Sequence, residues 1–401
     1  MQKEILKPTT IFIVGSRTGG PLIPLLGLKD ELAKCRNDLK FMIVGIQGGF
    51  EESAAKTENL PILFLPEAKF KRPHLSGASP LKKIISVIEL PFTISGTLFR
   101  LIHSFYRSLV ILRRENPALI LSMSNFLIVP LAWAKATLNF FRKINNSVKK
   151  ISGRPSLPTI KIALHQMDIT NLTVRLTAPF SDLYTAGFQE IADKAKRSIQ
   201  VIPNPVRYDK FDTLNQADSI QKLFTAKLVD PSLKKPLLLI FGGGSGSAFI
   251  NNWVLENQKA LLEKFQILHL YGFLQKNVPD YEALPGFIQK EGLKEMMPAA
   301  LVAADAVLSR AGMSTISELL YLKKRAYLVP IPGTHQEENA RIVAPLFPTL
   351  RQSNSSSWLN TLLSDFQHPK EKSDLPLNNY YSAKNRYLYR DMILNLLPSK
   401  P

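Results

Sequence analysis

Two glycine-rich turns, each between an apolar run and a helix-like segment, constrain the fold of this chain most. The first, Gly15–Gly20 (GSRTGG), follows the apolar run Thr9–Val14. The second lies within Phe241–Asn252 (FGGGSGSAFINN) and follows Pro236–Phe241. A buried strand, a glycine turn and a helix begin a βαβ unit. Because this unit occurs twice in 401 residues, we predict an α/β chain with two Rossmann-like domains, each with its own core.

Further apolar runs extend both series of strands. They are Lys40–Ile46, Leu60–Leu65, Leu119–Ser122, Ile160–Leu164, Ile267–Tyr271, Phe287–Ile288, Ala304–Leu308 and Arg325–Val329. Strands that alternate with helices indicate parallel sheets with crossover helices. Asn139–Pro158 is polar, basic and rich in turn residues, and is predicted as a loop or insertion. Pro203 and Pro205 cannot continue a central strand, so we predict domains over 1–203 and 204–379, with a helix at about 380–401 packing back on the first.

The positive charge is concentrated in one region. The chain carries a formal charge of +19, and Lys69–Lys161 alone holds 16 basic and 2 acidic residues beside long apolar stretches. This combination is typical of a surface that rests on an anionic membrane. The alternatives are a solvated basic face and nucleic-acid binding, but no zinc-finger spacing, RNP-like motif or heptad zipper supports nucleic acid. The single cysteine, Cys35, excludes an intrachain disulfide and a cysteine-built metal site.

The segment Leu308–Leu319 (LSRAGMSTISEL) contains the groups that a nucleotide diphosphate needs. Gly312 is predicted at a turn, where a ligand can approach the backbone closely. Ser314 and Thr315 are predicted at a helix start, where free amides suit a phosphate. Glu318, predicted in the first turn of that helix, can accept hydrogen bonds from a ribose diol. The alternative is an ordinary capping box, in which the Ser/Thr-x-x-Glu pattern only closes the helix.

Three other features point to the same chemistry less specifically. The turn Gly242–Gly246 lacks the spacing of a Walker A loop, but its successive amides can cradle a phosphate. Gln336 and Asn339, in a predicted loop after a strand, can donate to sugar hydroxyls, or the loop only caps a helix. Arg207 can clamp a diphosphate as a bidentate donor, or it is an ordinary surface arginine.

The order of these motifs along the chain resembles that of the MurG glycosyltransferases. The matching residues are Thr18, Gly19, Gly20 and Pro24; His165; Asn204–Arg207; Gly242, Gly243, Gly246, Ser247 and Asn251; Ser309–Leu319; and His335–Ala340. The resemblance implies a GT-B fold, with two Rossmann-like domains facing across a central cleft. It implies inverting transfer of N-acetylglucosamine from UDP-N-acetylglucosamine to lipid I, the undecaprenyl-diphospho-muramoyl-peptide, forming lipid II for peptidoglycan. It implies no metal or cofactor, and a peripheral location on the cytoplasmic face of the bacterial membrane.

The resemblance also implies roles for individual residues. The donor-binding set would be Arg207, Gly243, Gly244, Gly246, Ser247, Asn251, Phe287, Ile288, Gly312, Ser314, Thr315, Glu318, Gln336 and Asn339. Within it, Glu318 would bind the ribose, Phe287–Ile288 would lie near the uracil, and Gln336 with Asn339 would face the sugar. The acceptor would be bound by Thr18, Gly19 and Gly20.

Three positions depart from the family pattern. Pro21 replaces a histidine, Gln166 replaces a glutamate, and Gly244 replaces a serine. Because a base must deprotonate the attacking hydroxyl, His165 and Asp168 are the remaining candidates for it. Two rivals therefore stay open: a MurG-like transferase with another lipid acceptor, and a degenerate, non-catalytic nucleotide-sugar-binding protein. The sequence does not give the oligomeric state.

Overall fold

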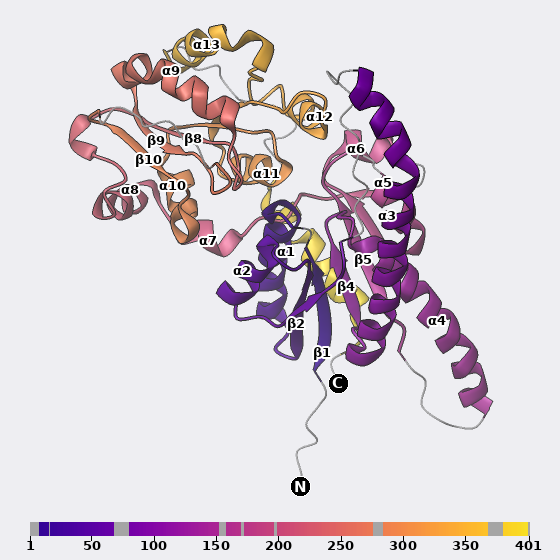
Figure 1. Cartoon of the computed structure of the whole chain (residues 1–401). Helices are drawn as coiled ribbons and strands as arrows, with labels where there is room; N and C mark the ends of the chain where they lie inside the picture. The colour runs from indigo at the N-terminus through magenta and orange to yellow at the C-terminus, as the bar shows by residue number, and fades with distance from the viewer. Residues whose placement is uncertain are drawn as a thin grey trace. The chain divides into compact units, whose positions relative to one another are not determined.

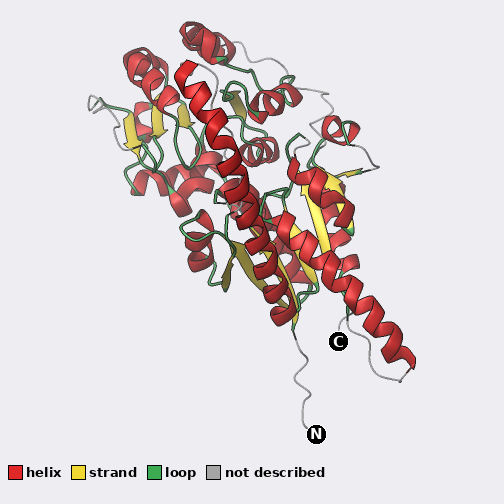
Figure 2. Ribbon diagram, turned by 45° about the vertical axis from the view of Figure 1, so that its right-hand side comes forward, coloured by secondary structure: helices red, strands yellow, loops and turns green. Residues whose placement is uncertain are grey.

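The computed structural model describes residues 8–15, 17–67, 80–151, 158–169, 172–195, 199–275, 284–367 and 380–399, without the side chains of 80–95 and 148–151. It divides the chain into two compact units. One consists of Met1–Val201 with Tyr389–Pro401, and the other of Ile202–Leu388. Figure 1 shows the course of the chain through both units, and Figure 2 shows their strands enclosed by helices.

The first unit is built on a parallel sheet of seven strands in the order β3-β2-β1-β4-β5-β6-β7. The strands are β1 (Thr9–Val14), β2 (Leu39–Gly45), β3 (Ile62–Phe64), β4 (Leu119–Ser122), β5 (Lys161–Gln166), β6 (Leu183–Ala186) and β7 (Gln200–Val201). The central strand β1 pairs Ile11 with Phe41 of β2 and with Leu119 of β4. Its residues are almost entirely buried, as expected for a strand covered on both faces.

The helices of this unit connect its parallel strands and cover them. They are α1 (Gly19–Cys35), α2 (Phe50–Thr57), α3 (Pro80–Glu115), α4 (Ile128–Ile151), α5 (Leu172–Thr177), α6 (Gln189–Asp193) and α15 (Leu388–Leu396). The C-terminal segment is tied to this unit by main-chain acceptors: Arg36 donates to the carbonyl of Pro398 at 2.6 Å, and Lys161 to that of Leu396 at 2.6 Å.

The second unit has a parallel sheet of five strands in the order β10-β9-β8-β11-β12. Its strands are β8 (Leu237–Phe241), β9 (Gln266–Leu270), β10 (Phe287–Lys290), β11 (Ala306–Ser309) and β12 (Arg325–Leu328). Its helices are α7 (Tyr208–Asp212), α8 (Gln216–Thr225), α9 (Ala248–Lys264), α10 (Met297–Ala303), α11 (Met313–Tyr321), α12 (His335–Ile342), α13 (Trp358–Gln367) and α14 (Ala383–Arg386). Both sheets, with their crossover helices, confirm the predicted α/β class and the two Rossmann-like domains.

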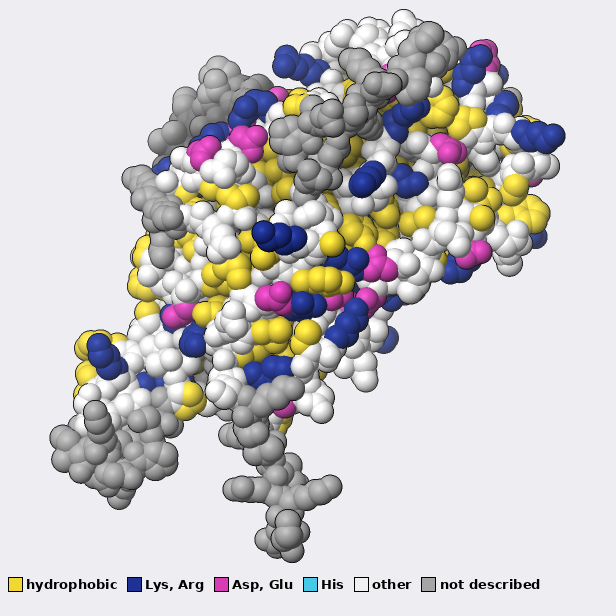
Figure 3. All heavy atoms as spheres, turned by 180° about the vertical axis from the view of Figure 1, so that it is seen from behind, with side chains coloured by type: hydrophobic (Ala, Val, Ile, Leu, Met, Phe, Trp, Pro, Cys, Tyr) yellow, Lys and Arg dark blue, Asp and Glu magenta, His cyan; other side chains and the backbone are white. Residues whose placement is uncertain are grey.

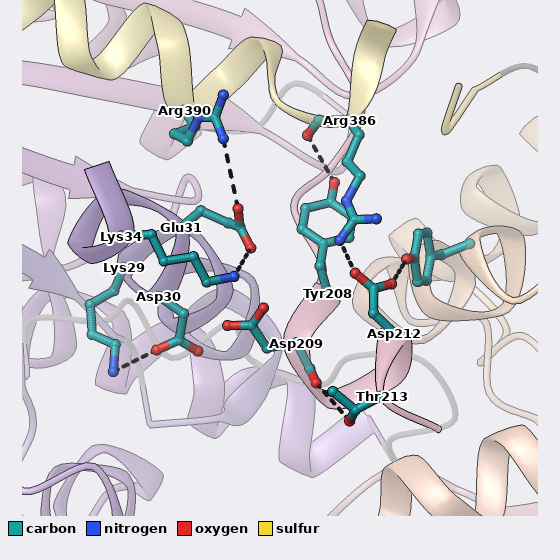
Figure 4. A network of polar contacts seen from close by, with 11 residues as sticks. Lys29, Asp30, Glu31, Lys34, Tyr208, Asp209, Asp212, Thr213, Arg386 and Arg390 are labelled. Carbon is teal, nitrogen blue, oxygen red and sulfur yellow. Dashed lines mark hydrogen bonds and ion pairs between the residues drawn. The ribbon is translucent and has the colours of Figure 1, made fainter. Parts of the chain in front are cut away.

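The end of the second unit differs from the predicted boundary at residue 379. Tyr380 and Tyr381 bond the main chain of Asn204: its amide donates to the Tyr380 hydroxyl at 2.9 Å, and the Tyr381 hydroxyl donates to its carbonyl at 2.6 Å. Further along, Arg386 donates to Asp212 of α7 and lies 4.2 Å from the Tyr208 ring (Figure 4). Residues 380–388 therefore belong to the second unit, and Tyr389–Pro401, with all of α15 except its first residue, belong to the first.

Two local predictions were wrong. Asn139–Pro158 is not a loop over its whole length, because α4 continues to Ile151; the glycine and prolines of this stretch all follow that residue. Asn139 fixes the helix to the sheet through paired bonds with the main chain of Ile160. Likewise His335 does not lie in a loop: it is the first residue of α12, whose preceding Thr334 accepts from the Gln336 amide.

No helix within the described ranges is both long enough and apolar enough to cross a membrane.

Candidate functional site

The glycine-rich turn after β8 leaves backbone amides at the carboxyl edge of the second sheet. Gly243 and Gly246 have positive φ angles of 84° and 81°, which only glycine adopts readily. A Cβ added at Gly246 would lie 2.0 Å from the Tyr271 carbonyl oxygen, whereas one at Gly243 would meet nothing within 4 Å. Ser247 then caps α9 by accepting from the Ile250 amide at 3.2 Å. The turn is thus tightly packed on one side and open at Gly243.

Arg310, directly after β11, ties three strand ends together. It donates to the Ser247 hydroxyl at 2.6 Å and to the Val329 carbonyl, after β12, at 3.1 Å. Burial lowers the pKa of this guanidinium to about 10, so it keeps its positive charge at neutral pH. The sequence prediction missed Arg310, although a charged residue directly after a buried strand was the available signal. It places a cation beside the amides of the Gly243–Gly246 turn.

The helix α11 presents the predicted nucleotide-binding segment. Gly312 is its N-cap, and a Cβ there would meet nothing within 4 Å, so a ligand can approach. Ser314 and Thr315 lie in the first turn and are half-buried. The N-cap is Gly312, and Ser314 and Thr315 lie inside the helix instead of capping it, so the capping-box alternative is wrong. Glu318 was predicted in the first turn but lies in the second, because the helix begins at Met313.

Glu318 lies next to the segment that carries Arg207. The side chain of Asn204, fully buried, donates to Ser317 of α11 at 3.0 Å, which holds the Asn204–Arg207 segment against this helix. Burial raises the pKa of Glu318 to about 7, and the positive charge of Arg207 opposes that rise. The structure therefore brings Glu318, the residue predicted to bind the ribose, close to Arg207, the residue predicted to bind the diphosphate.

Other predicted donor residues are engaged within the second unit. Asn339 is fully buried and donates to the Ala311 carbonyl at 3.1 Å, and Gln336, half-buried, accepts from the Ile331 amide at 3.2 Å. Asn251 donates to the Tyr271 carbonyl at 3.2 Å and contacts His269 at 3.0 Å. These bonds shape the strand-end loops. Direct contact of these side chains with the donor remains a prediction.

The two residues predicted near the uracil, and the neighbouring His269, also differ in burial. Phe287 is buried in the core of the second unit, while Ile288 is half-buried in β10. Burial lowers the pKa of His269 to about 3, so its imidazole is neutral at physiological pH, and the side chain has a structural role in the core. Of the two predicted uracil neighbours, Ile288 is therefore the more accessible one.

On the acceptor side, His165 and Asp168 differ in exposure. His165 is fully buried; its Nδ1 lies 2.8 Å from the Thr185 hydroxyl, and its ring centroid lies 5.1 Å from that of Tyr389. Asp168 is half-buried, and its carbonyl accepts from Gln166 at 2.9 Å. The role of either residue as base remains a prediction. Asp168 is the one that reaches the surface.

The predicted acceptor loop lies at the N-terminus of α1. Thr18 is exposed and precedes the helix without a side-chain cap, and Gly20 faces open space. Gly19 is close-packed: an added Cβ would lie 3.1 Å from Ile23 Cδ1 and 3.3 Å from Phe50 Cε1. No side chain therefore caps the start of this 17-residue helix within the described residues.

Glu51 of α2 is a second residue that the sequence prediction missed. It is fully buried, and its side chain fills the space next to Gly15, Gly45 and Gly49. Burial raises the pKa of this carboxyl, while the backbone amides of Glu51 and Arg17 and the charge of Arg17 oppose the rise. Three glycines far apart in sequence gave no local signal of this arrangement.

Comparison with known proteins agrees with this geometry. The family model of the glycosyltransferase family 28 C-terminal domain matches residues 237–379. Two curated relatives, from Clostridium kluyveri and Clostridium botulinum (strain Loch Maree), are named UDP-N-acetylglucosamine--N-acetylmuramyl-(pentapeptide) pyrophosphoryl-undecaprenol N-acetylglucosamine transferase. The first is 27% identical over 80% of this chain and 78% of its own length, and the second 28% over 94% and 92%.

Solved structures show the same fold. The crystal structure of Acinetobacter baumannii MurG has a TM-score of 0.60 at 16% identity and covers 97% of this chain and 99% of its own. The calicheamicin glycosyltransferase CalG4 also has a TM-score of 0.60, at 12% identity, covering 98% of each chain. The chain therefore has the GT-B fold of these glycosyltransferases and is similar to MurG-type transferases along most of its length, and its residues 237–379 match the glycosyltransferase family 28 C-terminal domain.

Proposed function

We propose that this protein transfers N-acetylglucosamine from UDP-N-acetylglucosamine to the undecaprenyl-diphospho-muramoyl-pentapeptide, lipid I, with inversion at the sugar. The similarity to named transferases over 94% of this chain carries the proposal. The second unit supports it, because the turn at Gly243, the guanidinium of Arg310 and the carboxyl of Glu318 follow the adjacent strands β8 and β11. Open α/β sheets bind their ligands at such carboxyl ends.

In the proposed reaction the acceptor hydroxyl attacks C1 of the sugar from the face opposite the UDP. The new C1–O bond forms as the bond between C1 and the phosphate oxygen breaks, and the electron pair leaves with UDP. The amides of the Gly243–Gly246 turn and the charge of Arg310 stabilise the negative charge that develops on the diphosphate. The hydroxyl proton passes to a base, for which Asp168 is better exposed than His165.

The first unit supports a peripheral position on the membrane. Along the described part of α3, one stripe is buried and the other exposes large apolar side chains: Leu98, Phe99, Ile102, Tyr106 and Val110. The helix α4 exposes three more: Phe140, Phe141 and Ile144. Arginines and lysines, including Arg100, Arg107 and Lys143, lie between them. We define these residues of α3 and α4 as the apolar-basic surface.

An apolar and basic surface suits the interface of an anionic bilayer, which takes up aromatic side chains and attracts cations. Figure 3 shows the molecule from behind; on that face Lys and Arg side chains, with some Asp and Glu, are scattered among hydrophobic ones. Of the basic region predicted at Lys69–Lys161, residues 69–79 and 152–157 lie outside the described residues. A lipid-linked acceptor would reach the protein from this bilayer.

The direct test is transfer of labelled sugar. Purified protein is incubated with labelled UDP-N-acetylglucosamine and a short-chain analogue of lipid I, and the lipid product is extracted and counted. We expect product with this acceptor, and a loss of about 10²-fold or more in turnover for Arg310→Ala. Transfer only to a diacylglycerol or to another polyprenyl sugar would show that lipid I is not the acceptor. UDP binding without any transfer would show that the protein is a degenerate, non-catalytic binder.

A further inference from the structure

The turn that follows β9 is fastened to the glycine-rich turn that follows β8. The backbones of Gly272 and Gly246 are in contact, since a Cβ added at Gly272 would lie 2.2 Å from the Gly246 Cα. Gln275 donates its side-chain amide to the Ser245 carbonyl at 3.2 Å. Phe273 lies between these two anchor points, so its position relative to the glycine-rich turn is fixed.

The ring of Phe273 takes the space of a side chain at position 244. Gly244 does not need glycine for its backbone, because the positive φ angles of this turn belong to Gly243 and Gly246. A Cβ at Gly244 would lie 3.0 Å from Cε1 and 3.4 Å from Cζ of Phe273, tighter than ordinary packing. The Phe273 amide also donates to the Gly244 carbonyl at 3.2 Å. Gly244 and Phe273 therefore form one packing unit.

Although it is held in place, the Phe273 side chain is 55% exposed. An exposed aromatic ring on a fixed turn gains free energy when a ligand covers it. The turn beneath it presents the amides that we propose for the diphosphate. A ring there also excludes water from one side of the site, which strengthens the hydrogen bonds of those amides and the attraction of Arg310.

We propose that Phe273, packed on Gly244, is a donor-binding residue that forms the apolar wall of the diphosphate site. This inference rests on the proposed function and names the part of the donor that the ring contacts. Because the ring lies on the turn itself, it contacts what the turn binds, the nucleoside diphosphate. UDP and UDP-N-acetylglucosamine share that part, so the ring contributes to the binding of both.

The test compares Phe273→Ala with Leu274→Ala. Leu274 is a matched control, because it is the next residue of the same turn and is 63% exposed. In calorimetric titrations we expect Phe273→Ala to weaken the binding of both UDP and UDP-N-acetylglucosamine by about tenfold, as expected for the loss of an aromatic contact. We expect Leu274→Ala to bind both as the wild type does. Three results would overturn the proposal: unchanged affinity in Phe273→Ala, an equal loss of affinity in Leu274→Ala, or a loss of affinity for UDP-N-acetylglucosamine without a loss for UDP.

A second pair of variants tests the packing unit itself. Gly244→Ala should weaken UDP binding in the wild type, because the new methyl group displaces the ring, and should add little in the Phe273→Ala background. Additive losses would overturn the pairing. Unchanged thermal unfolding shows that the variants are folded. If the wild type itself does not bind UDP, the proposed function fails; if it binds and Phe273→Ala binds equally, only this inference fails.

Discussion

At the scale of the residue, Glu318, the predicted ribose-binding residue, has a consequence for stability. Its pKa in the folded chain is about 7, above the ordinary 4.5, because burial opposes ionisation. Between these two pH values the folded state binds more protons than the unfolded state, so the free energy of unfolding falls as pH rises. Above pH 7 the ionised carboxylate costs about 1–3 kcal/mol. A buried acid that destabilises its own fold is typical of functional sites, in agreement with the predicted role of Glu318.

Glu318→Gln removes this cost. We expect its melting temperature to exceed that of the wild type at pH 8 and to match it at pH 4, while UDP binding weakens by about 1–3 kcal/mol through loss of the charged acceptor. Thermal unfolding at the two pH values and titration with UDP measure both effects. A lower melting temperature at pH 8, with unchanged UDP affinity, would show that Glu318 is structural.

Glu51 gives a related prediction in the first unit. Its carboxyl is fully buried beside three glycines, and burial raises its pKa. The ionised form therefore costs stability at high pH, and Glu51→Gln should unfold at a higher denaturant concentration than the wild type at pH 8. Glu52→Gln, at the exposed neighbouring position, should change the free energy of unfolding by less than about 0.5 kcal/mol. If Glu51→Gln is as unstable as Glu51→Ala, the negative charge itself is required.

The positions of residues inside contiguous motifs were predictable, and contacts with distant partners were not; the binding roles of these residues remain predictions. Gly312, Ser314, Thr315 and Glu318 occur within one segment, where glycine, helix start and acid have local meanings. The role of Arg310 depends on carbonyls and a hydroxyl from two other segments. The local sequence shows only a charged residue directly after a buried strand, and it does not show these contacts with distant segments.

At the scale of the element, strands such as β1 and β8 were predicted well because each is an apolar run that is buried over almost its whole length. The helix α4 was not, since its second half combines polar and basic residues with exposed Phe140, Phe141 and Ile144. That composition indicates a loop if every helix must bury an apolar face. Bonds from Asn139 and Arg142 to the segment Pro158–Ile160 hold the helix in place instead.

The helix α15 makes a testable contribution to the first unit. Tyr389 is 3% exposed and packs against the ring of His165. Tyr389→Ala should lower the free energy of unfolding by about 3–5 kcal/mol, because it leaves a cavity in this core. Arg390→Ala is the control: Arg390 lies 3.9 Å from Glu31 (Figure 4), and an ion pair of that kind contributes under about 1 kcal/mol. Equal effects in denaturant unfolding would show that α15 is held by its charges.

At the scale of the whole molecule, the two series of strands could be predicted from the sequence, because each βαβ series repeats the same order of apolar run, turn and helix. The predicted donor site and the exposed apolar and basic side chains of α3 and α4 lie in different units. The predicted donor residues lie in the unit Ile202–Leu388, and the apolar-basic surface lies in the other. Such a division lets one unit hold a soluble nucleotide while the other meets a membrane.

That division predicts how the whole protein partitions onto vesicles. With a net charge of +19, it should bind anionic phosphatidylglycerol vesicles at about 0.1 M salt and be largely released at about 1 M, because salt screens the attraction.

Phe99→Asp should weaken this binding, since Phe99 is 72% exposed on α3, and Arg113→Glu with Arg114→Glu should weaken it further. Phe224→Asp is the matched control, an exposed phenylalanine of the other unit. Sedimentation with vesicles measures each variant. Equal binding to neutral and anionic vesicles at low salt, or equal losses for Phe99→Asp and Phe224→Asp, would show that the apolar-basic surface does not hold the protein on the membrane.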